Sequence, residues 1–276
     1  MTDASADSDS VSTEAARLDA ELVRRGLARS RALAVEAIQA GLVSVDGATA
    51  VKASTKVAPD AVLALEGGDQ YVSRGAHKLI GALDAFAIDP SGRIALDAGA
   101  STGGFTQVLL ERGAARVIAV DVGHGQLSTV VQDDPRVASL EGVNIRELTG
   151  EQLAAHLGDP AQPLSLVVGD LSFISLRHVL KPLRDVANPD ADFVLLVKPQ
   201  FEVGRGGIRE GIVRDPALRR EAVSEVLWAA WDLGLGTAGV IPSPILGGNG
   251  NHEYLVWLTR EGQNPGEWLD VIAQLP

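Results

Sequence analysis

Short apolar runs alternate with segments of helical periodicity from about residue 92 onward. The apolar runs, each of which ends at a polar residue, lie at 94–96, 117–120, 166–168 and 193–197. The helical segments between and after them lie at roughly 103–112, 125–132, 150–157, 174–187 and 216–233. Buried strands that alternate with helices predict a parallel, doubly wound α/β sheet. Beyond the last helix, residues 237–241 and 253–258 flank a loop rich in Pro, Gly and Asn, which predicts a closing pair of antiparallel strands.

The chain before residue 70 has a different pattern, in which two short helical stripes precede alternating apolar residues. The first stripe stops at Gly26, and the second, which Ser30 can cap, ends at Gly41. The Asp46-Gly47 pair then predicts a hairpin turn, and the apolar positions beyond it predict further strands. These signals together predict a compact α+β unit of small size.

Four segments follow from these patterns. They are an acidic, disordered tail at 1–16, a small α+β domain at 17–68, a linker with a lead-in helix at 69–91 and the sheet domain at 92–276.

Charge is distributed unevenly over these segments. The whole chain carries a net charge of −12, yet residues 17–56 hold seven basic and four acidic residues, a net of +3. From residue 57 onward there are 17 basic and 28 acidic residues. Because salt screens charge effects beyond about 10 Å, a basic module can bind a polyanion even when the rest of the chain is acidic.

Composition excludes several classes of protein. Hydrophobic residues make up 46% and charged residues 22% of the chain, as in soluble globular proteins. The absence of cysteine excludes disulfides, zinc–thiolate sites and thiol nucleophiles. No apolar run is long enough for a membrane helix, and the acidic start has no secretory signal pattern, so we expect a cytoplasmic protein. The histidines show no metal-ligand spacing, so no metal is expected.

Glycines, apolar positions and basic residues fall in register between Arg17 and Gly47, in the pattern RLD…L…G…SR..A...I..G.V.VDG. This pattern resembles the αL-type RNA-binding domain first described in a small-subunit ribosomal protein. The resemblance implies that the helices present basic side chains to structured RNA. The alternative is an ordinary solvated helix face. The candidate RNA contacts are Arg17, Arg24, Arg25, Arg29, Arg31, Lys52 and, beyond this module, Arg74.

The segment LDAGASTGGF at 96–105 follows the first strand and opens a helix. Its glycines let the backbone approach a ligand closely, and the Gly-Lys-Ser/Thr of a phosphate loop is missing. The segment resembles motif I of class I S-adenosylmethionine-dependent methyltransferases, with Ser101 where many members have glycine. In this interpretation Asp97 faces the amino group and sulfonium of the methyl donor and Asp121 binds both ribose hydroxyls. Asn144 lies near the adenine edge or in a plain surface loop. The alternative cofactor is a nicotinamide dinucleotide. The candidate cofactor-binding residues are Asp97, Gly99, Ala100, Ser101, Gly103, Gly104, Phe105, Asp121, Asn144 and Asp170.

Asp170 and Lys198 each close an apolar strand of the predicted sheet. Parallel strands end at a common edge, where ligands bind, so these side chains should converge. Methylation at pyrimidine carbon five by the usual route needs a cysteine, which the chain lacks. The Asp/Asn-Pro-Pro-aromatic segment of amino-methylating enzymes is also absent. A ribose hydroxyl instead needs a positioned base, a role that Lys198 can fill while Asp170 orients it.

Lys78, Asp170, Lys198 and Glu253, in this order, match the Lys-Asp-Lys-Glu tetrad of RrmJ-like (FtsJ-like) ribose 2′-O-methyltransferases. The carrying segments are SRGAHKL at 73–79, LDAGASTGGFT at 96–106, DLSFISL at 170–176 and VKPQFEVG at 197–204. Through them the chain resembles the TlyA family. The resemblance implies an S-adenosylmethionine-dependent enzyme that methylates cytidine 2′-hydroxyls of ribosomal RNA within ribosomal subunits, and we expect it to act as a monomer.

Other functions stay open at this stage. A ribosome-binding assembly factor could use the methyl-donor site for regulation, and a small-molecule methyltransferase would leave the basic module without purpose. The family is often labelled haemolytic, but no membrane span or basic amphipathic helix is apparent in the sequence. The loop 204–207, with Arg209 and Arg214, either clamps RNA or is a mobile surface loop.

Overall fold

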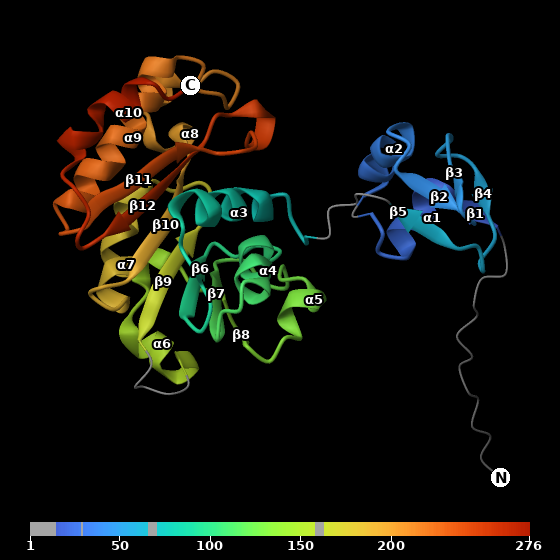
Figure 1. Ribbon diagram of the computed structural model, residues 1–276, viewed down its shortest axis with the longest axis horizontal. Coiled ribbons are helices and arrows are strands. Elements are labelled where there is room, and N and C mark those ends of the chain that lie inside the picture. Colours follow the sequence, from blue (N-terminus) through green and yellow to red (C-terminus); the bar gives the residue numbers. More distant parts are fainter. Residues whose placement is uncertain (1–14, 29, 66–70, 158–162) are drawn as a thin grey trace, which may run out of the picture. The chain divides into compact units, whose positions relative to one another are not determined.

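The computed structural model describes residues 15–28, 30–65, 71–157 and 163–276 (Figure 1). The chain divides into an N-terminal unit, which extends to residue 70, and a C-terminal unit from Tyr71 to Pro276. The predicted tail and the Arg29 position lie outside the described residues, except that residues 15 and 16 are described.

The N-terminal unit is a small α+β fold. Its elements are β1 (Ala16–Arg17), α1 (Leu18–Arg24), α2 (Arg31–Gln39), β2 (Val43–Val45), β3 (Ala48–Thr49), β4 (Lys56–Val57) and β5 (Leu63–Leu65). Strand β2 lies between β3 and β5 in an antiparallel sheet, and β1 pairs with β4. Leu18, Leu22, Ile38 and Val43 are buried between the helices and the sheet and form the core. Burial of these apolar side chains stabilises the unit.

Local sequence signals explain the turns of this unit. The Ser30 hydroxyl accepts a hydrogen bond from the Leu33 amide at 3.3 Å, as expected of a helix cap. Asp46 and Gly47 have φ values of 50° and 81°, which match the two-residue turn of a right-twisted hairpin. The predicted cap and hairpin are therefore confirmed. Strand β1 was not predicted, because two residues are too short for a periodic signal.

A seven-stranded sheet forms the centre of the C-terminal unit, in the order β11-β12-β10-β9-β6-β7-β8. Its strands are β6 (Ile94–Ala98), β7 (Arg116–Asp121), β8 (Val137–Glu141), β9 (Leu164–Gly169), β10 (Asp192–Val197), β11 (Gly236–Pro242) and β12 (Tyr254–Thr259). Strands β6 to β10 are parallel, and β12 runs antiparallel to both β10 and β11. The predicted doubly wound sheet with a closing antiparallel pair is confirmed.

Helices cover both faces of this sheet (Figure 1). They are α3 (Gly75–Phe86), α4 (Gly104–Glu111), α5 (Thr129–Gln132), α6 (Gly150–Leu157), α7 (Leu180–Val186), α8 (Pro199–Glu202), α9 (Pro216–Trp231) and α10 (Leu269–Ala273). One face packs against α3, α4 and α5, and the other against α6, α7, α9 and α10. Asp215 caps α9 by accepting a hydrogen bond from the Ala217 amide at 2.8 Å, which confirms the predicted helix start.

Two predictions of secondary structure need correction. Strand β8 was missed, because it lies at the sheet edge and only Leu140 of its residues is buried, which leaves no apolar run. The helix expected at 174–187 is reduced to α7 and a preceding single turn of 3-10 helix, Leu176–His178. Residues 170–175 instead form a loop at the carboxyl end of β9. That loop matters because it carries part of the candidate site.

Candidate active site

Four charged side chains from distant parts of the sequence meet at one edge of the sheet. Asp170 and Lys198 follow the parallel strands β9 and β10 directly, and Glu253 immediately precedes β12. Because β12 is antiparallel to β10, its start lies at the edge where β10 ends. Lys78 comes from the first turns of α3. The topology of the sheet therefore explains why these four predicted residues are brought together.

The four side chains form a continuous chain of alternating charge. Lys78 Nζ lies 2.7 Å from Glu253 Oε2 and 3.4 Å from Asp170 Oδ2. Lys198 Nζ lies 2.5 Å from Asp170 Oδ1 and donates a hydrogen bond to Ser172 Oγ at 2.8 Å. Each cation thus contacts a carboxylate, which offsets the cost of removing these charges from water. The contacts hold Lys198 in one position.

The chain of charges is closed at one end and accessible at the other. Glu253 is buried against Gly247, where a Cβ atom would lie 2.0 Å from Glu253 Oε1, so only glycine fits. Asp170 is half-buried, and Lys78, Asp170 and Lys198 line a cavity of about 300 Å³. Glu253 therefore supports Lys78 from behind, whereas Asp170 and Lys198 are available to a ligand.

Two further segments complete the wall of this first cavity. Ser73–Gly75, which belongs to the SRGAHKL segment, lies before and at the start of α3. Ile245–Gly248, which the sequence analysis did not single out, lies in the loop between β11 and β12. The Gly247-Gly248 pair in a Pro- and Asn-rich loop is the sequence feature from which this second segment could have been predicted to approach a ligand closely. The first cavity also contains Arg74, an exposed candidate RNA contact.

A second cavity of about 520 Å³ adjoins the first, and Gly99, Ser101, Asp170 and Ser172 line both. At its polar end are Asp121 and Asn144. Its apolar wall consists of Val122, Val143, Ile145, Leu171, Phe173 and Ile174. A carboxylate beside an apolar slot suits the ribose and the base of an adenosyl group, and the Asp170 carboxylate at the junction suits a cationic centre. The residues present thus fit the methyl donor.

The loop between β6 and α4 is held in a conformation that explains its small residues. Gly99, Ser101 and Gly103 have φ values of 82°, 49° and 95°, in the left-handed region that favours glycine. The Ser101 amide donates a hydrogen bond to Asp121 Oδ2 at 2.8 Å, which links this loop to the end of β7. This bond holds the strained Ser101 backbone in place.

The remaining candidate cofactor residues differ in their access to the two cavities. Ala100, Gly104 and Phe105 line the first cavity, and Asn144 lines the second. The Asn144 side chain also accepts a hydrogen bond from the Arg146 amide at 3.1 Å and so caps a turn. Gly103 lines neither of the two; a Cβ there would lie 2.8 Å from Leu127, so this glycine serves close packing.

Asp97 lies behind the loop rather than at a cavity wall. Its side chain is 0% exposed, and Oδ2 accepts a hydrogen bond from the Thr106 hydroxyl at 2.6 Å. Oδ1 has no hydrogen-bond partner among the described residues. Burial raises the pKa of Asp97 to about 7, because the charged form loses its hydration. The structure therefore does not bring Asp97 to the surface of either cavity.

An exposed aromatic side chain at the second cavity was also missed by the sequence analysis. Phe173 is 92% exposed and has a φ of 65°, an unusual conformation for a bulky residue. Its ring lies 5.3 Å from that of Phe201, which in turn lies 6.0 Å from Lys198 Nζ. The segment DLSF at 170–173 gave the position of this phenylalanine but not its exposure. An exposed ring at the mouth of the site, which contacts Phe201 rather than Lys198 itself, is suited to stack on a nucleobase.

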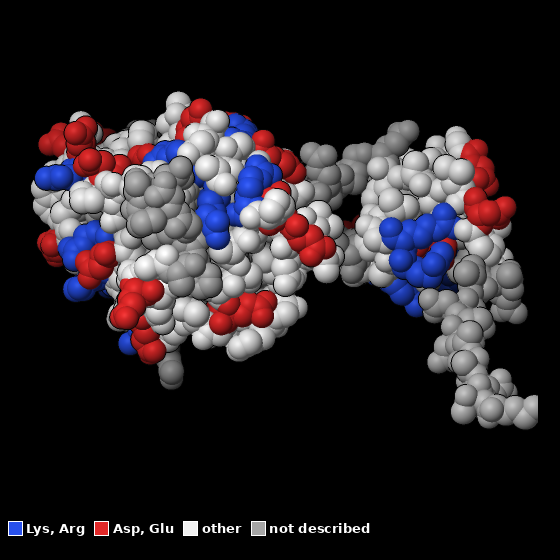
Figure 2. Space-filling view, turned by 90° about the horizontal axis from the view of Figure 1, so that it is seen from below, with Lys and Arg blue, Asp and Glu red and all other residues white. Residues whose placement is uncertain are grey.

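Basic side chains gather on one face of the N-terminal unit (Figure 2). Arg17 and Arg31 contact Asp19, and Arg24 and Arg25 contact Glu21. The side chains of Arg24 and Arg31 are 66% and 60% exposed. Lys52, another candidate RNA contact, is exposed as well.

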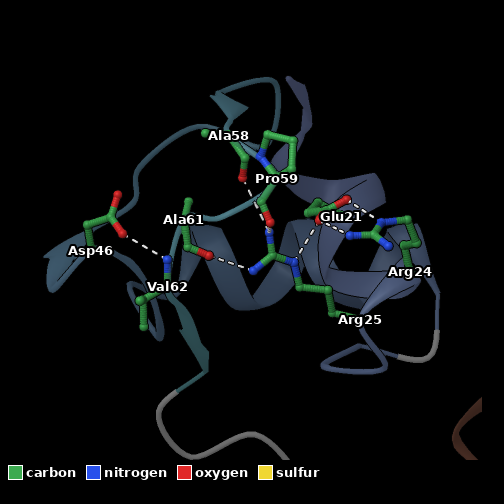
Figure 3. A network of polar contacts seen from close by, with 8 residues as sticks. All are labelled: Glu21, Arg24, Arg25, Asp46, Ala58, Pro59, Ala61 and Val62. Atoms are coloured by element: carbon green, nitrogen blue, oxygen red, sulfur yellow. Dashed lines mark hydrogen bonds and ion pairs between the residues drawn. The ribbon is translucent and has the colours of Figure 1, made fainter. Parts of the chain in front are cut away.

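Arg25 differs from its neighbours because it binds the unit's own backbone (Figure 3). Its guanidinium donates to the carbonyl oxygens of Ala61 at 2.5 Å, Pro59 at 2.9 Å and Ala58 at 3.3 Å. Its Nε donates to Glu21 at 2.6 Å, and the side chain is 22% exposed. Among the predicted RNA contacts that the structure describes, Arg25 is therefore the one whose donors fasten α1 to the segment before β5.

Two features of the described residues bear on other functions. No helix within the described ranges is both long and apolar enough to cross a membrane. In the same part of the chain, no three His, Cys, Asp or Glu side chains converge in a way that could hold a metal ion.

Comparisons with known proteins can now be set beside this geometry. The FtsJ-like methyltransferase family matches residues 71–260, and the S4 domain family matches residues 16–63. The 16S/23S rRNA (cytidine-2′-O)-methyltransferase TlyA of Mycobacterium tuberculosis is 54% identical over 89% of this chain and 90% of its own length. Hemolysin A of Brachyspira hyodysenteriae is 36% identical over 87% of this chain and 98% of its own. A solved structure from Streptococcus thermophilus, provisionally named a hemolysin, is 37% identical with a TM-score of 0.72, over 95% of this chain and 96% of its own.

Proposed function

The chain belongs to the TlyA family of FtsJ-like methyltransferases, and from this membership we propose that it methylates the 2′-hydroxyl of cytidine in ribosomal RNA. The observation that carries the proposal is the alternating chain of Glu253, Lys78, Asp170 and Lys198, whose accessible end lies where the two cavities join.

S-adenosylmethionine is the proposed methyl donor, and it supplies an electrophilic methyl group when bound. Asp121 would hold the ribose, and the apolar wall around Ile145 and Leu171 would hold the adenine. Asp170, at the junction of the cavities, would face the cationic part. Asp97 lies in the strand that leads into the same loop, and its buried Oδ1 has no hydrogen-bond partner within the described ranges. A cationic group of the donor near this loop would favour the ionised form of Asp97.

Lys198 is the proposed base. A ribose hydroxyl is a poor nucleophile until its proton is withdrawn, so a group with a free lone pair has to lie beside it. Lys198, as the free amine, would accept the hydroxyl proton as the ribose oxygen bonds to the methyl carbon. The bond between that carbon and the sulfonium sulfur of the donor breaks in the same step, so that a neutral thioether leaves, and Asp170 would stabilise the ammonium that results. The contact of 2.5 Å between Lys198 Nζ and Asp170 supports this division of roles. Lys78 and Glu253 keep Asp170 in place.

The target nucleotide would enter through the first cavity. Its ribose would reach Lys198 while Phe173 stacks on the base, which requires the nucleotide to leave its helix or loop. Arg74, exposed at the same cavity, would contact a neighbouring phosphate. Much of the rate acceleration would come from holding the two reactants close together, as in other two-substrate enzymes.

The N-terminal unit would bind ribosomal RNA through its exposed arginines, with ribosomal subunits in the cytoplasm as the natural substrate. The match of residues 16–63 to the S4 domain family supports this assignment. Phosphate contacts of this type give affinity that falls steeply with salt.

The test is to incubate the full chain with radiolabelled S-adenosylmethionine and unmodified ribosomal subunits, and to map the label by resistance to alkaline cleavage. We expect label at a cytidine whose 3′ linkage resists alkali. Label on a base would contradict the ribose mechanism. Binding of subunits and cofactor without any label would contradict the enzyme assignment and favour an assembly factor.

A further inference from the structure

Two acidic residues are buried directly beneath the basic face of the N-terminal unit. Asp19 and Glu21, both in α1, are each 3% exposed. Acidic side chains are almost never buried unless they are paired. Two carboxylates lower the net positive charge of this surface and so weaken its electrostatic attraction for RNA. Their position therefore needs another physical reason.

Each of these carboxylates joins two arginines. Arg17 donates to both oxygens of Asp19 at 3.0 Å, and Arg31 donates to Asp19 Oδ2 at 2.9 Å. Arg24 likewise donates to both oxygens of Glu21, at 2.7 and 2.5 Å, and Arg25 joins it. Hydrogen bonds from Arg17 hold the pKa of Asp19 well below its usual range, and those from Arg24 lower the pKa of Glu21 to about 2. Both acids are therefore ionised at neutral pH.

The pairing fixes the arginines without hiding them. A guanidinium held by two parallel hydrogen bonds to one carboxylate has a defined plane and position. The Arg17, Arg24 and Arg31 side chains nevertheless remain 43%, 66% and 60% exposed. Each guanidinium has more N–H donors than these contacts use, so donors remain for a phosphate.

We propose that Asp19 and Glu21 are positioning residues for RNA binding, which hold Arg17, Arg31 and Arg24 in a fixed array that matches RNA phosphates. This inference rests on the proposed function, because it takes ribosomal RNA as the partner of the N-terminal unit. A long, flexible arginine loses conformational freedom when it binds, and an arginine that is already held loses less. The acids thus favour binding although they lower the positive charge of the surface.

The proposal has an unusual consequence. Asp19→Asn and Glu21→Gln each make the unit more positive by one charge, yet each should weaken its binding to RNA. The matched control is Glu36→Gln, which makes the same change in charge at an exposed position of α2. By electrostatic attraction alone, all three variants would bind RNA equally or more tightly than the parent chain.

The experiment measures binding of the full chain to unmodified ribosomal subunits at several salt concentrations. We expect Asp19→Asn and Glu21→Gln to weaken binding by about three- to tenfold, the effect of freeing one or two side chains. Glu36→Gln should bind as tightly as the parent or more tightly. The proposal is overturned if the three variants bind alike.

A double-mutant cycle separates positioning from a merely structural role. If Glu21 acts through Arg24, then Glu21→Gln should have little further effect on binding once Arg24 is alanine. The same loss in both backgrounds would overturn the proposal, and thermal unfolding shows whether each variant is folded. Failure of the parent chain to methylate the same subunits would instead contradict the proposed function, so the two failures are distinguishable.

Discussion

The two units of the molecule combine lysine or arginine with buried carboxylates in opposite arrangements. In the C-terminal unit Lys78, Lys198 and Glu253 are buried, and the half-buried Asp170 lies where the two cavities join. In the N-terminal unit the acids Asp19 and Glu21 are buried, whereas their partners Arg17, Arg24 and Arg31 remain exposed. The first arrangement neutralises charge and holds single atoms at fixed positions, as proton transfer requires. The second leaves an excess of positive charge at the surface, as binding to a polyanion requires.

The largest effect is expected from Lys198, on which the catalytic side of this comparison depends. Lys198→Ala removes the proposed base and should lower the methylation rate by at least about a hundredfold, the usual contribution of general-base catalysis. Single-turnover assays with labelled methyl donor measure the rate, and equilibrium dialysis should show cofactor affinity within a few-fold of the parent. Lys181→Ala, at an exposed lysine of α7, is the control.

Lys198→Arg tests whether position 198 acts as a base or only through its positive charge. Arginine keeps the positive charge but cannot release its proton near neutral pH. We expect this variant to be as inactive as Lys198→Ala. An active arginine variant would show that position 198 acts through charge alone, and the contrast between the two units would then disappear.

The next effect concerns Glu253, the buried acid of the catalytic chain. Glu253→Gln keeps a similar shape but removes the charge that holds Lys78 at 2.7 Å. We expect kcat to fall by about ten- to hundredfold, as when partners of catalytic groups are changed, while KM for the RNA stays within a few-fold. Steady-state kinetics on ribosomal subunits measure both values, with Glu261→Gln as an exposed control. A change confined to KM would contradict a supporting role for Glu253.

Asp97 extends the comparison to a buried acid that forms no ion pair with another residue in the described part of the chain. Its pKa of about 7 is above the ordinary value of 3.8, so the folded protein binds this proton more tightly than the unfolded chain does. Stability should therefore fall as pH rises from about 4 to 7. Asp97→Asn removes the titrating group and with it this dependence of stability on pH. Between pH 5 and 8 the free energy of unfolding of the parent should therefore fall by about 2–3 kcal/mol more than that of the variant. Urea unfolding without cofactor at both pH values measures the difference, and equal losses would contradict the raised pKa.

The smallest effect is expected from a comparison of the neighbouring residues Arg24 and Arg25, of which one is proposed to bind RNA and the other to stabilise the fold. Arg25→Ala should lower the free energy of unfolding of the N-terminal unit by about 1–3 kcal/mol, because Glu21 and three carbonyl oxygens lose a donor. Arg24→Ala should lower the stability less than Arg25→Ala does, because Glu21 keeps its bond to Arg25 and no backbone carbonyl loses a donor, but it should weaken subunit binding and flatten its salt dependence. Thermal unfolding and binding at several salt concentrations test the pair. The opposite pattern would mean that Arg25, not Arg24, contacts RNA.

Sequence was most informative where topology limits the possibilities. Asp170 and Lys198 could be placed together because parallel strands end at one edge, and Glu253 joins them because β12 is antiparallel. Local signals also placed the Ser30 cap and the Asp46-Gly47 turn. In each case the position of the residue follows either from its immediate sequence neighbours or from the direction in which the strands of a sheet run.

Contacts between distant segments could not be predicted from the sequence by these rules. Arg24 and Arg25 are adjacent and chemically identical, and only the folded backbone at 58–61 decides which of them is used internally. The exposure of Phe173 depends on its left-handed backbone, in the loop just before the helix that was expected at 174–187. Asp97 was expected at the cofactor, but its burial depends on how the loop and α4 pack over it.

The junction of the two cavities at Gly99, Ser101, Asp170 and Ser172 has a consequence for inhibitor design. Because the same four residues line both cavities, we expect one molecule that extends past these residues to occupy both. An adenosine joined by a short cationic linker to a cytidine would place its positive charge at Asp170 and hold each half at a high local concentration for the other. Such a compound should bind far more tightly than either nucleoside alone, and it would distinguish this enzyme from methyltransferases that share only the adenosine compartment.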